Sequence, residues 1–379
     1  MKRSDTASSA APSGKRVRLA IIFMLCALTA PTAAFSQTPA GTVVNESAHF
    51  KSLEGNLLKD SADRSFAVYL PFSYQKGRKR YPVIYLLHGG NHSYPAWIDD
   101  PHYATVPKIM DKLIASGSVR EMIIVMPDGS NAFGNSMWTN SVTTGNWEDY
   151  IALDLVDYID KKYRTDARPA SRGIAGHSSG GYGAIKLAMK HPQVFGAVYA
   201  LSACCLGWDK GWSATSPAWE KALAMRSMDD FTAMAKLVAA GNPRDPQWLS
   251  EFLSIADIAV AAAFSPNPER PPFYADFPVE KHGDTFTISE RQQAAWMANL
   301  PIPMLGQYRS NLAKLRGIAF DIGTQDFNPT LLVQAHDLDA ALTTNGIPHE
   351  FEEFTGTHTD KLAERVENKL LPFFSRVLQ

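Results

Sequence analysis

The sequence predicts an α/β protein with an open, mostly parallel central sheet and helices on both faces. Nearly continuous apolar runs at 81–90 and 121–129 are typical of strands that are buried on both faces. Between them, residues 106–117 carry apolar side chains at helical spacing. A strand, a helix and a strand in this order indicate a parallel pair with a crossover helix, and the alternation recurs along the chain.

Each further element follows from its own pattern. The run 64–71 alternates apolar and polar residues and predicts the first strand. The stretch 147–163 places its apolar residues on one face of a helix. Later strands are predicted at 172–177, 194–203, 317–323 and 350–356, later helices at 181–190 and 331–342, and a closing helix ends in residues 370–378.

The alternation stops after Ser202 and resumes at about residue 316. A stretch of this length is too long for a structureless loop in a compact domain, and it holds helical patches beside Trp-rich and Pro-rich pieces. We predict an insertion at about 206–316 that lies over one edge of the sheet and serves as a lid and substrate-pocket region. Residues 37–379 would then form a single domain; a separate domain within the insertion is the alternative.

The first 36 residues differ from the rest of the chain. Three basic residues within 15–18 precede an apolar run of about a dozen residues, and small residues follow up to Ser36, which is the pattern of a cleavable secretory signal (residues 1–36). The apolar run is shorter than the about 20 residues that a membrane-spanning helix needs. We therefore expect a periplasmic or secreted protein without a retained membrane anchor.

Two adjacent cysteines, Cys204 and Cys205, remain after removal of this signal. In an oxidising compartment they could form a strained vicinal disulfide, whereas two buried thiols are the simpler interpretation. Their spacing is not that of metal ligands. The formal net charge of −1 gives no reason to expect a nucleic-acid partner.

A candidate nucleophile lies in the motif Gly176-His177-Ser178-Ser179-Gly180. The motif ends a short apolar strand and opens a helix rich in small residues, which is the setting of a nucleophile elbow. The sharp turn of such an elbow raises the serine hydroxyl above the sheet. We predict that Ser178 is the nucleophile; a glycine–serine turn without chemistry is the alternative.

A serine nucleophile needs a base and an acid that orients the base. Of the ten histidines, His358 stands out because it follows a predicted strand and precedes the last helix, where a loop can carry its imidazole over the strand ends. His177 adjoins the serine and is expected to point elsewhere. The acid should follow the preceding strand, where Asp326 lies in the loop and Asp321 at the strand end. We predict the triad Ser178, Asp326 and His358, with Asp321 as the alternative acid.

The oxyanion that forms during acyl transfer needs backbone N–H donors. One is expected from Ser179, the residue after the nucleophile. The other is expected from the loop that begins His88-Gly89-Gly90, with Gly90 as the predicted donor and Gly89 as the alternative. His88 itself is expected to shape this loop.

These motifs resemble the putative-esterase branch of the α/β hydrolases, which includes esterase D (S-formylglutathione hydrolase), feruloyl esterases, enterochelin esterases and mycolyltransferases. The resemblance is carried by YPVIYLLHGG, MPDG, NWEDYI and GIAGHSSGGYGAI, with the Asp326 loop and His358, and runs from about Arg64 to the end of the chain. It implies an α/β-hydrolase fold. The chain departs from many members in having Ser179 where they have methionine, a change that keeps the backbone donor.

The resemblance implies a serine carboxylic-ester hydrolase that works through an acyl-enzyme and requires no metal or organic cofactor. Together with the secretory pattern of residues 1–36, it predicts an exported esterase. Its expected partner is a small-molecule ester. Aromatic residues of the insertion either line a pocket for an apolar or aromatic group or pack the insertion itself; they are Trp208, Trp212, Trp219, Phe264, Phe273 and Trp296. The alternatives are acyl transfer to an alcohol, as in the mycolyltransferases, hydrolysis of an S-formylglutathione-type thioester, and a binding protein without chemistry.

Overall fold

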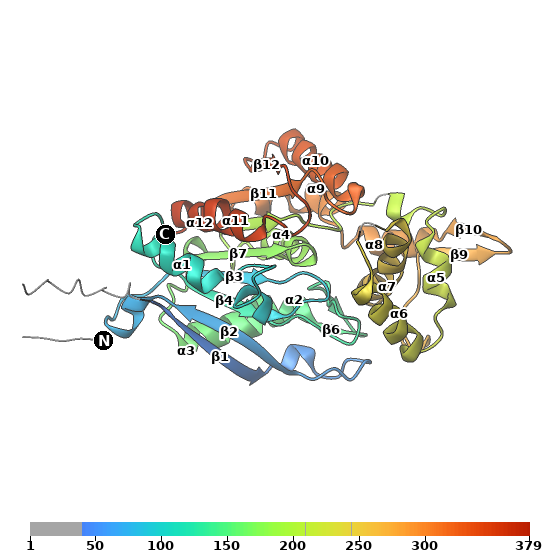
Figure 1. Cartoon of the computed structure of the whole chain (residues 1–379), viewed down its shortest axis with the longest axis horizontal. Coiled ribbons are helices and arrows are strands. Elements are labelled where there is room, and N and C mark those ends of the chain that lie inside the picture. The colour runs from blue at the N-terminus through green and yellow to red at the C-terminus, as the bar shows by residue number, and fades with distance from the viewer. Residues whose placement is uncertain (1–39, 209, 244) are drawn as a thin grey trace, which may run out of the picture. The chain divides into compact units, whose positions relative to one another are not determined.

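An eight-stranded sheet forms the centre of the chain, in the order β1-β2-β4-β3-β7-β8-β11-β12 (Figure 1). The computed structural model describes residues 40–379 apart from Asp209 and Arg244, so the predicted signal at residues 1–36 lies outside the described residues. The strands of the sheet are β1 Thr42–His49, β2 Asp63–Leu70, β3 Val83–Leu87, β4 Ile123–Pro127, β7 Arg172–His177, β8 Ala197–Leu201, β11 Gly317–Gly323 and β12 Glu350–Phe354.

The sheet is parallel over most of its width and antiparallel at one edge. β3 pairs in parallel with β4 and with β7, and parallel pairing continues through β8 and β11 to β12. β2 runs antiparallel to both β1 and β4. The predicted open, mostly parallel sheet is confirmed.

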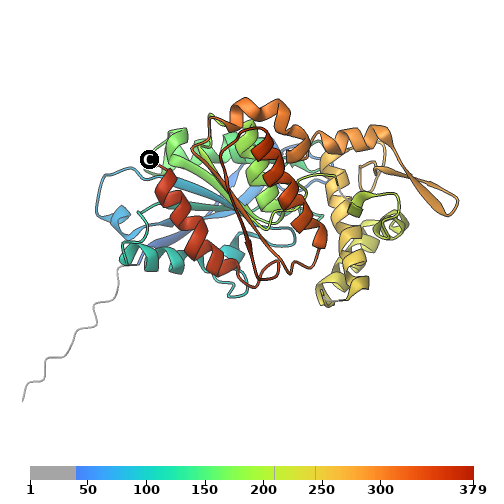
Figure 2. The ribbon, with the colours of Figure 1, turned by 90° about the horizontal axis from the view of Figure 1, so that it is seen from above.

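Helices cover both faces of the sheet (Figure 2). Successive side chains of a strand point to opposite faces, and in the central strands both sets are apolar and must be buried. In β3, Ile84 joins the apolar cluster beneath α1, α11 and α12, whereas Val83 and Tyr85 join the cluster beneath α3, α4, α9 and α10. These helices are α1 Val106–Ala115, α3 Val156–Lys162, α4 Ser179–Lys190, α9 Pro301–Leu312, α10 Pro329–Thr344, α11 Leu362–Arg365 and α12 Leu371–Val377. The short α2 Trp147–Asp149 leads into α3 through a π-helical turn at Tyr150–Leu155, and a second one at Val366–Leu370 joins α11 to α12.

Between β8 and β11 the chain builds a helical insertion with an apolar core of its own, at one side of the sheet in Figures 1 and 2. Its elements are α5 Ala218–Ala224, α6 Met228–Ala240, α7 Pro246–Phe264, the hairpin β9 Val279–His282 and β10 Thr285–Ile288, and α8 Glu290–Met297. Among the described residues α7 alone is long and apolar enough to cross a membrane, and 72% of its window Gln247–Phe264 is buried, as in the central helix of a packed unit. α9 instead contributes Met304 and Leu305 to the core beside α4.

Five strands were not predicted from the sequence: β1 and the two short pairs β5–β6 and β9–β10. β1 was not predicted because it is an edge strand whose side chains are half-buried or exposed, so that TVVNESAH carries no continuous apolar run. The hairpin β9–β10 and the two-residue pair β5 Asn140–Ser141 and β6 Gly145–Asn146 are also too short or too exposed to leave such a pattern. These strands lie outside the buried part of the sheet, where apolar runs are informative.

Candidate active site

Ser178 occupies a sharp turn between β7 and α4. Its φ of 56° and ψ of −120° are a strained combination for a residue with a side chain. The turn is tight because a Cβ on Gly176 would overlap the backbone of Gly180, and a Cβ on Gly180 would overlap the Leu87 carbonyl. The amide of Ser178 donates to the Leu201 carbonyl of β8 at 2.9 Å. The structure therefore holds Ser178 as a nucleophile elbow does, at the N-terminus of α4.

Asp326 and His358 form a hydrogen-bonded pair. The Nδ1 atom of His358 lies 2.6 Å from Oδ2 of Asp326, and the two side chains are 11% and 1% exposed. β11 and β12 are parallel neighbours, so the loops that carry these residues leave the same edge of the sheet. The amide of Gln325 donates to the Gly356 carbonyl at 2.9 Å and ties the two loops together. With Nδ1–H directed to the carboxylate, Nε2 of His358 is left to accept a proton.

His177, which was expected to point away from the site, contacts His358. Its Nε2–H donates to the His358 carbonyl at 2.9 Å, and its Nδ1 accepts from the Tyr103 hydroxyl at 3.0 Å. Burial, with the neighbouring His358, lowers the pKa of His177 well below its usual range, so the ring is neutral. The imidazole rings of His177 and His358 lie 4.6 Å apart between centroids, and His177 is the residue before Ser178. Within the described residues no hydrogen bond joins the Ser178 hydroxyl to His358.

The loop after β3 reaches the same edge of the sheet. The amide of Gly89 donates to the Tyr103 hydroxyl at 3.0 Å, whereas the amide of Gly90 has no partner among the described residues. His88 shapes the loop, since its Nδ1–H donates to the Gly89 carbonyl at 2.8 Å and its Nε2 accepts from the Gly129 amide at 2.8 Å. Of the two glycines, Gly90 is the one whose N–H is available to a ligand.

Asp321, the alternative acid, lies elsewhere. Its Oδ2 accepts from the Tyr199 hydroxyl at 2.8 Å and from Nε of Arg365 at 2.9 Å, beneath α11. Burial raises the pKa of Asp321 to about 6. Through these bonds Asp321 fastens β11 to β8 and α11.

Aromatic rings connect the insertion with His358. Phe327, the residue after Asp326, packs edge-on against His358 with ring centroids 5.0 Å apart. Trp248 and Phe252 of α7 each contact Phe327, with centroids 5.5 Å apart. The sequence analysis did not identify these three rings. The aromatic residues that it named pack in the core of the insertion: Trp208, Trp212, Trp219, Phe264, Phe273 and Trp296.

A buried polar cluster joins the elbow helix to the insertion. Lys186 of α4 donates to the Thr139 hydroxyl at 2.9 Å and to the Asn299 side chain at 2.8 Å, and the Tyr182 hydroxyl donates to the Asn299 carbonyl at 2.9 Å. Burial lowers the pKa of Lys186 to about 7. The cluster fixes the segment after α8 to the helix that follows the nucleophile.

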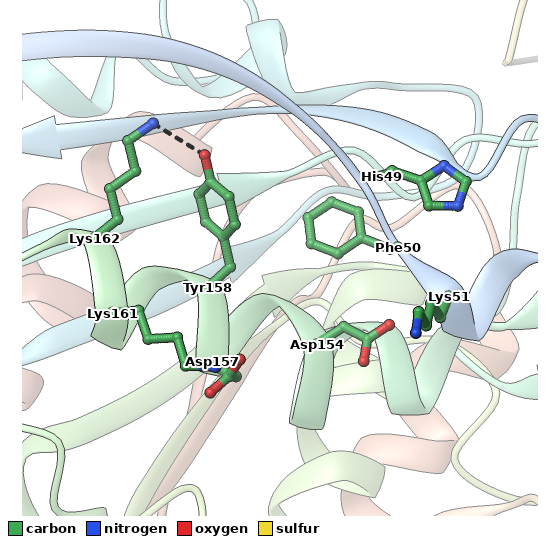
Figure 3. Close-up of a pocket in the computed structure, with 8 residues that line it drawn as sticks. All are labelled: His49, Phe50, Lys51, Asp154, Asp157, Tyr158, Lys161 and Lys162. Atoms are coloured by element: carbon green, nitrogen blue, oxygen red, sulfur yellow. Dashed lines mark hydrogen bonds and ion pairs between the residues drawn. The ribbon is translucent and has the colours of Figure 1, made fainter.

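The surface pockets of the described residues do not include the candidate site residues. A surface pocket of about 380 Å³ lies between β1 and α3 (Figure 3), and its Lys161 and Lys162 are paired with Asp157 and Glu46, each at 2.6 Å. Within the part of the chain that the structure describes, no group of three or more His, Cys, Asp or Glu side chains is arranged to hold a metal ion.

The chain is similar to known esterases in sequence and in fold. A family model described as putative esterase matches residues 61–362. An esterase of Mycobacterium tuberculosis is 36% identical over 125 residues, which are 33% of this chain and 25% of that protein. An endo-1,4-β-xylanase/feruloyl esterase of Xylanibacter ruminicola is 34% identical over 136 residues, 34% of this chain and 18% of that protein. Both alignments thus span a quarter or less of the relative.

A solved ferulic acid esterase superposes with a TM-score of 0.60 at 23% identity, covering 89% of this chain and 99% of that one. At this identity the similarity is evidence of the fold. The prediction of an α/β-hydrolase fold is confirmed.

Proposed function

Because the chain belongs to the putative esterase family, we propose that it is an exported serine hydrolase of carboxylic esters. The observation that carries this proposal is the Asp326–His358 hydrogen bond of 2.6 Å beside the strained turn of Ser178. These three residues supply an acid, a base and a nucleophile in the chain order of the α/β hydrolases. Export rests on the secretory pattern of residues 1–36.

In the proposed mechanism Ser178 attacks the ester carbonyl while Nε2 of His358 takes the hydroxyl proton. Asp326 holds the imidazole in the required tautomer and stabilises the imidazolium that forms. The oxyanion binds the amides of Ser179 and Gly90, since the Gly89 amide is engaged by Tyr103. His358 then protonates the leaving alcohol, and water activated by the same histidine releases the acid from the acyl-enzyme.

The proposed substrate is a small ester with an aromatic or apolar group. Phe327, Trp248 and Phe252 give the site an aromatic wall beside the base, and all three side chains are half-buried, so that each keeps part of its surface accessible. The similar proteins named as feruloyl or ferulic acid esterases point to the same kind of acyl group. In this proposal α7 of the insertion forms one wall of the substrate pocket.

The proposal is tested with Ser178→Ala. We expect hydrolysis of p-nitrophenyl acetate to fall by about 10⁶-fold in kcat, because removal of a serine nucleophile leaves only binding and oxyanion stabilisation. A fluorophosphonate probe should label the parent protein and not the variant. Ser213→Ala is the matched control, since Ser213 is a half-buried serine of the insertion whose hydroxyl bonds only locally, to the Lys210 carbonyl and the Thr215 hydroxyl. Retention of most activity by Ser178→Ala would refute the assignment.

The acyl-transfer alternative shares every catalytic residue and is distinguished by the products. Hydrolysis predicts free acid as the product even when a competing alcohol is present. A new ester as the main product would replace hydrolysis by acyl transfer without changing the residues involved.

A further inference from the structure

The turn Ser202–Cys205 lies directly against the nucleophile elbow. The amide of Cys204 donates to the Ser178 carbonyl at 3.3 Å, and the amide of Ser202 donates to the Asp321 carbonyl at 3.0 Å. The same Ser178 carbonyl accepts the first helical hydrogen bond of α4, from Tyr182 at 3.0 Å. A displacement of this turn would therefore shift the backbone of Ser178.

The turn carries two thiols in contact. The Sγ atoms of Cys204 and Cys205 lie 3.0 Å apart, and both residues are half-buried, so each keeps some access to solvent. Cys204 packs against the apolar cluster of Ile322, Leu331 and Ala335, between the end of β11 and the start of α10. The dithiol thus lies between the nucleophile elbow and the strand that leads to Asp326.

The backbone of the turn is strained. Ser202 has a φ of 41° and Cys205 a φ of 57°, in the left-handed region that residues with a Cβ rarely adopt. Such conformations cost on the order of 1–3 kcal/mol each and persist only where the surrounding structure enforces them, most often at functional sites. The mechanism proposed above uses neither residue.

We propose that Cys204 and Cys205 are a redox-sensitive dithiol that closes to a vicinal disulfide beside Ser178 and thereby lowers turnover. The oxidant is a low-molecular-weight disulfide. One cysteine thiolate attacks a sulfur of that disulfide and expels a small thiol; the second cysteine then attacks the mixed disulfide and expels the other small thiol. Two S–H bonds are lost, one S–S bond forms, and the reagent is reduced to two thiols.

The closed form is expected to be reversible. Adjacent Cα atoms are about 3.8 Å apart across a trans peptide, whereas relaxed disulfides span about 4.4–6.8 Å. The ring is therefore strained, and strained disulfides are the readily reduced ones. Closure has to move the Cys204 amide, and a displacement of about 1 Å near a nucleophile can cost up to about 10²-fold in rate.

The effect on turnover rests on the proposed esterase function, so the test measures the thiols separately. The full chain carrying Cys26→Ser, which removes the third cysteine of the sequence, is treated with oxidised glutathione. We expect the peptide with Cys204 and Cys205 to lose the mass of two hydrogens, and p-nitrophenyl acetate turnover to fall by about tenfold or more. Dithiothreitol should restore both.

A Cys204→Ser/Cys205→Ser double variant is the control, and the same oxidant should leave its turnover at its own starting value. Absence of the mass loss, or a mass loss with unchanged turnover, would overturn the switch. If the reduced protein shows no ester hydrolysis at all, the proposed function fails, while the mass measurement still decides whether the dithiol closes.

Discussion

The sheet body and the insertion reach the same site by different means. In the body, Asp326 and His358 are placed by loops that leave neighbouring parallel strands and are tied by backbone hydrogen bonds. Among the described residues, ring contacts link the insertion to His358, from Trp248 and Phe252 of α7 to Phe327 and from Phe327 to His358. Backbone pairing fixes a position regardless of the side chains, whereas ring packing depends on every ring in the series. We infer that the body carries the chemistry and that the insertion adjusts it.

The two aspartates of β11 and its loop give the sharpest test of the body. Asp326→Asn should lower kcat by about 10⁴-fold, because the amide no longer holds the imidazole in the right tautomer. Asp321→Asn should leave kcat within a few-fold, since Asp321 bonds Arg365 and Tyr199 and not the base. It should instead lower the stability by about 1–3 kcal/mol, as expected when a buried charged acceptor is lost.

Both variants are measured by ester hydrolysis and by thermal unfolding. A large loss of kcat in Asp321→Asn, with Asp326→Asn nearly active, would exchange the roles of the two carboxylates.

The places of the three proposed catalytic residues in the fold could be predicted from the sequence because each follows a strand with a strong pattern. Ser178 ends the apolar run of β7, and Asp326 and His358 follow β11 and β12, so that chain order and a parallel sheet suffice to bring them to one edge. The choice of Gly90 over Gly89 could not be settled in this way. It depends on Tyr103, whose hydroxyl meets the Gly89 amide and His177 only in the folded protein.

The insertion was less predictable, because its role also depends on side-chain contacts that form only in the folded protein. Its helices leave patterns, but which rings face the site is decided by how α7 packs against the Asp326 loop. Trp248, Phe252 and Phe327 carry no signal that separates them from the buried Trp219 or Trp296 of the insertion core. Long-range contacts of single side chains determine the wall of the site, and periodicity does not report them.

The buried hydroxyl of Tyr103 gives an intermediate effect within the body. In Tyr103→Phe the Gly89 amide loses its acceptor and His177 loses a donor, which leaves buried polar groups unpaired at a cost of about 1–3 kcal/mol. Because both groups adjoin the oxyanion loop and the base, we expect kcat to fall by about tenfold with little change in KM. Tyr199→Phe is the matched control: it removes an equally buried hydroxyl, at Asp321, and should reduce stability without this fall in kcat. Equal kcat losses in the two variants would show a general effect of destabilisation.

The smallest effect is expected from the insertion itself. Trp248→Leu removes the ring that stacks on Phe252 at 5.1 Å between centroids and contacts Phe327 at 5.5 Å. Acetyl ester hydrolysis should change by less than about threefold, whereas kcat/KM for a cinnamoyl ester should fall by about tenfold, since loss of an aromatic contact is worth about 0.5–1.5 kcal/mol beyond its buried area.

Phe277→Leu is the control, because Phe277 packs on Trp219 inside the insertion, away from Phe327. A cinnamoyl to acetyl ratio that is the same in both variants would mean that α7 supports the insertion but forms no part of the substrate wall. An equal loss on both esters in Trp248→Leu alone would mean that the ring series acts on His358, which would make the insertion part of the catalytic apparatus and erase the division between the two regions.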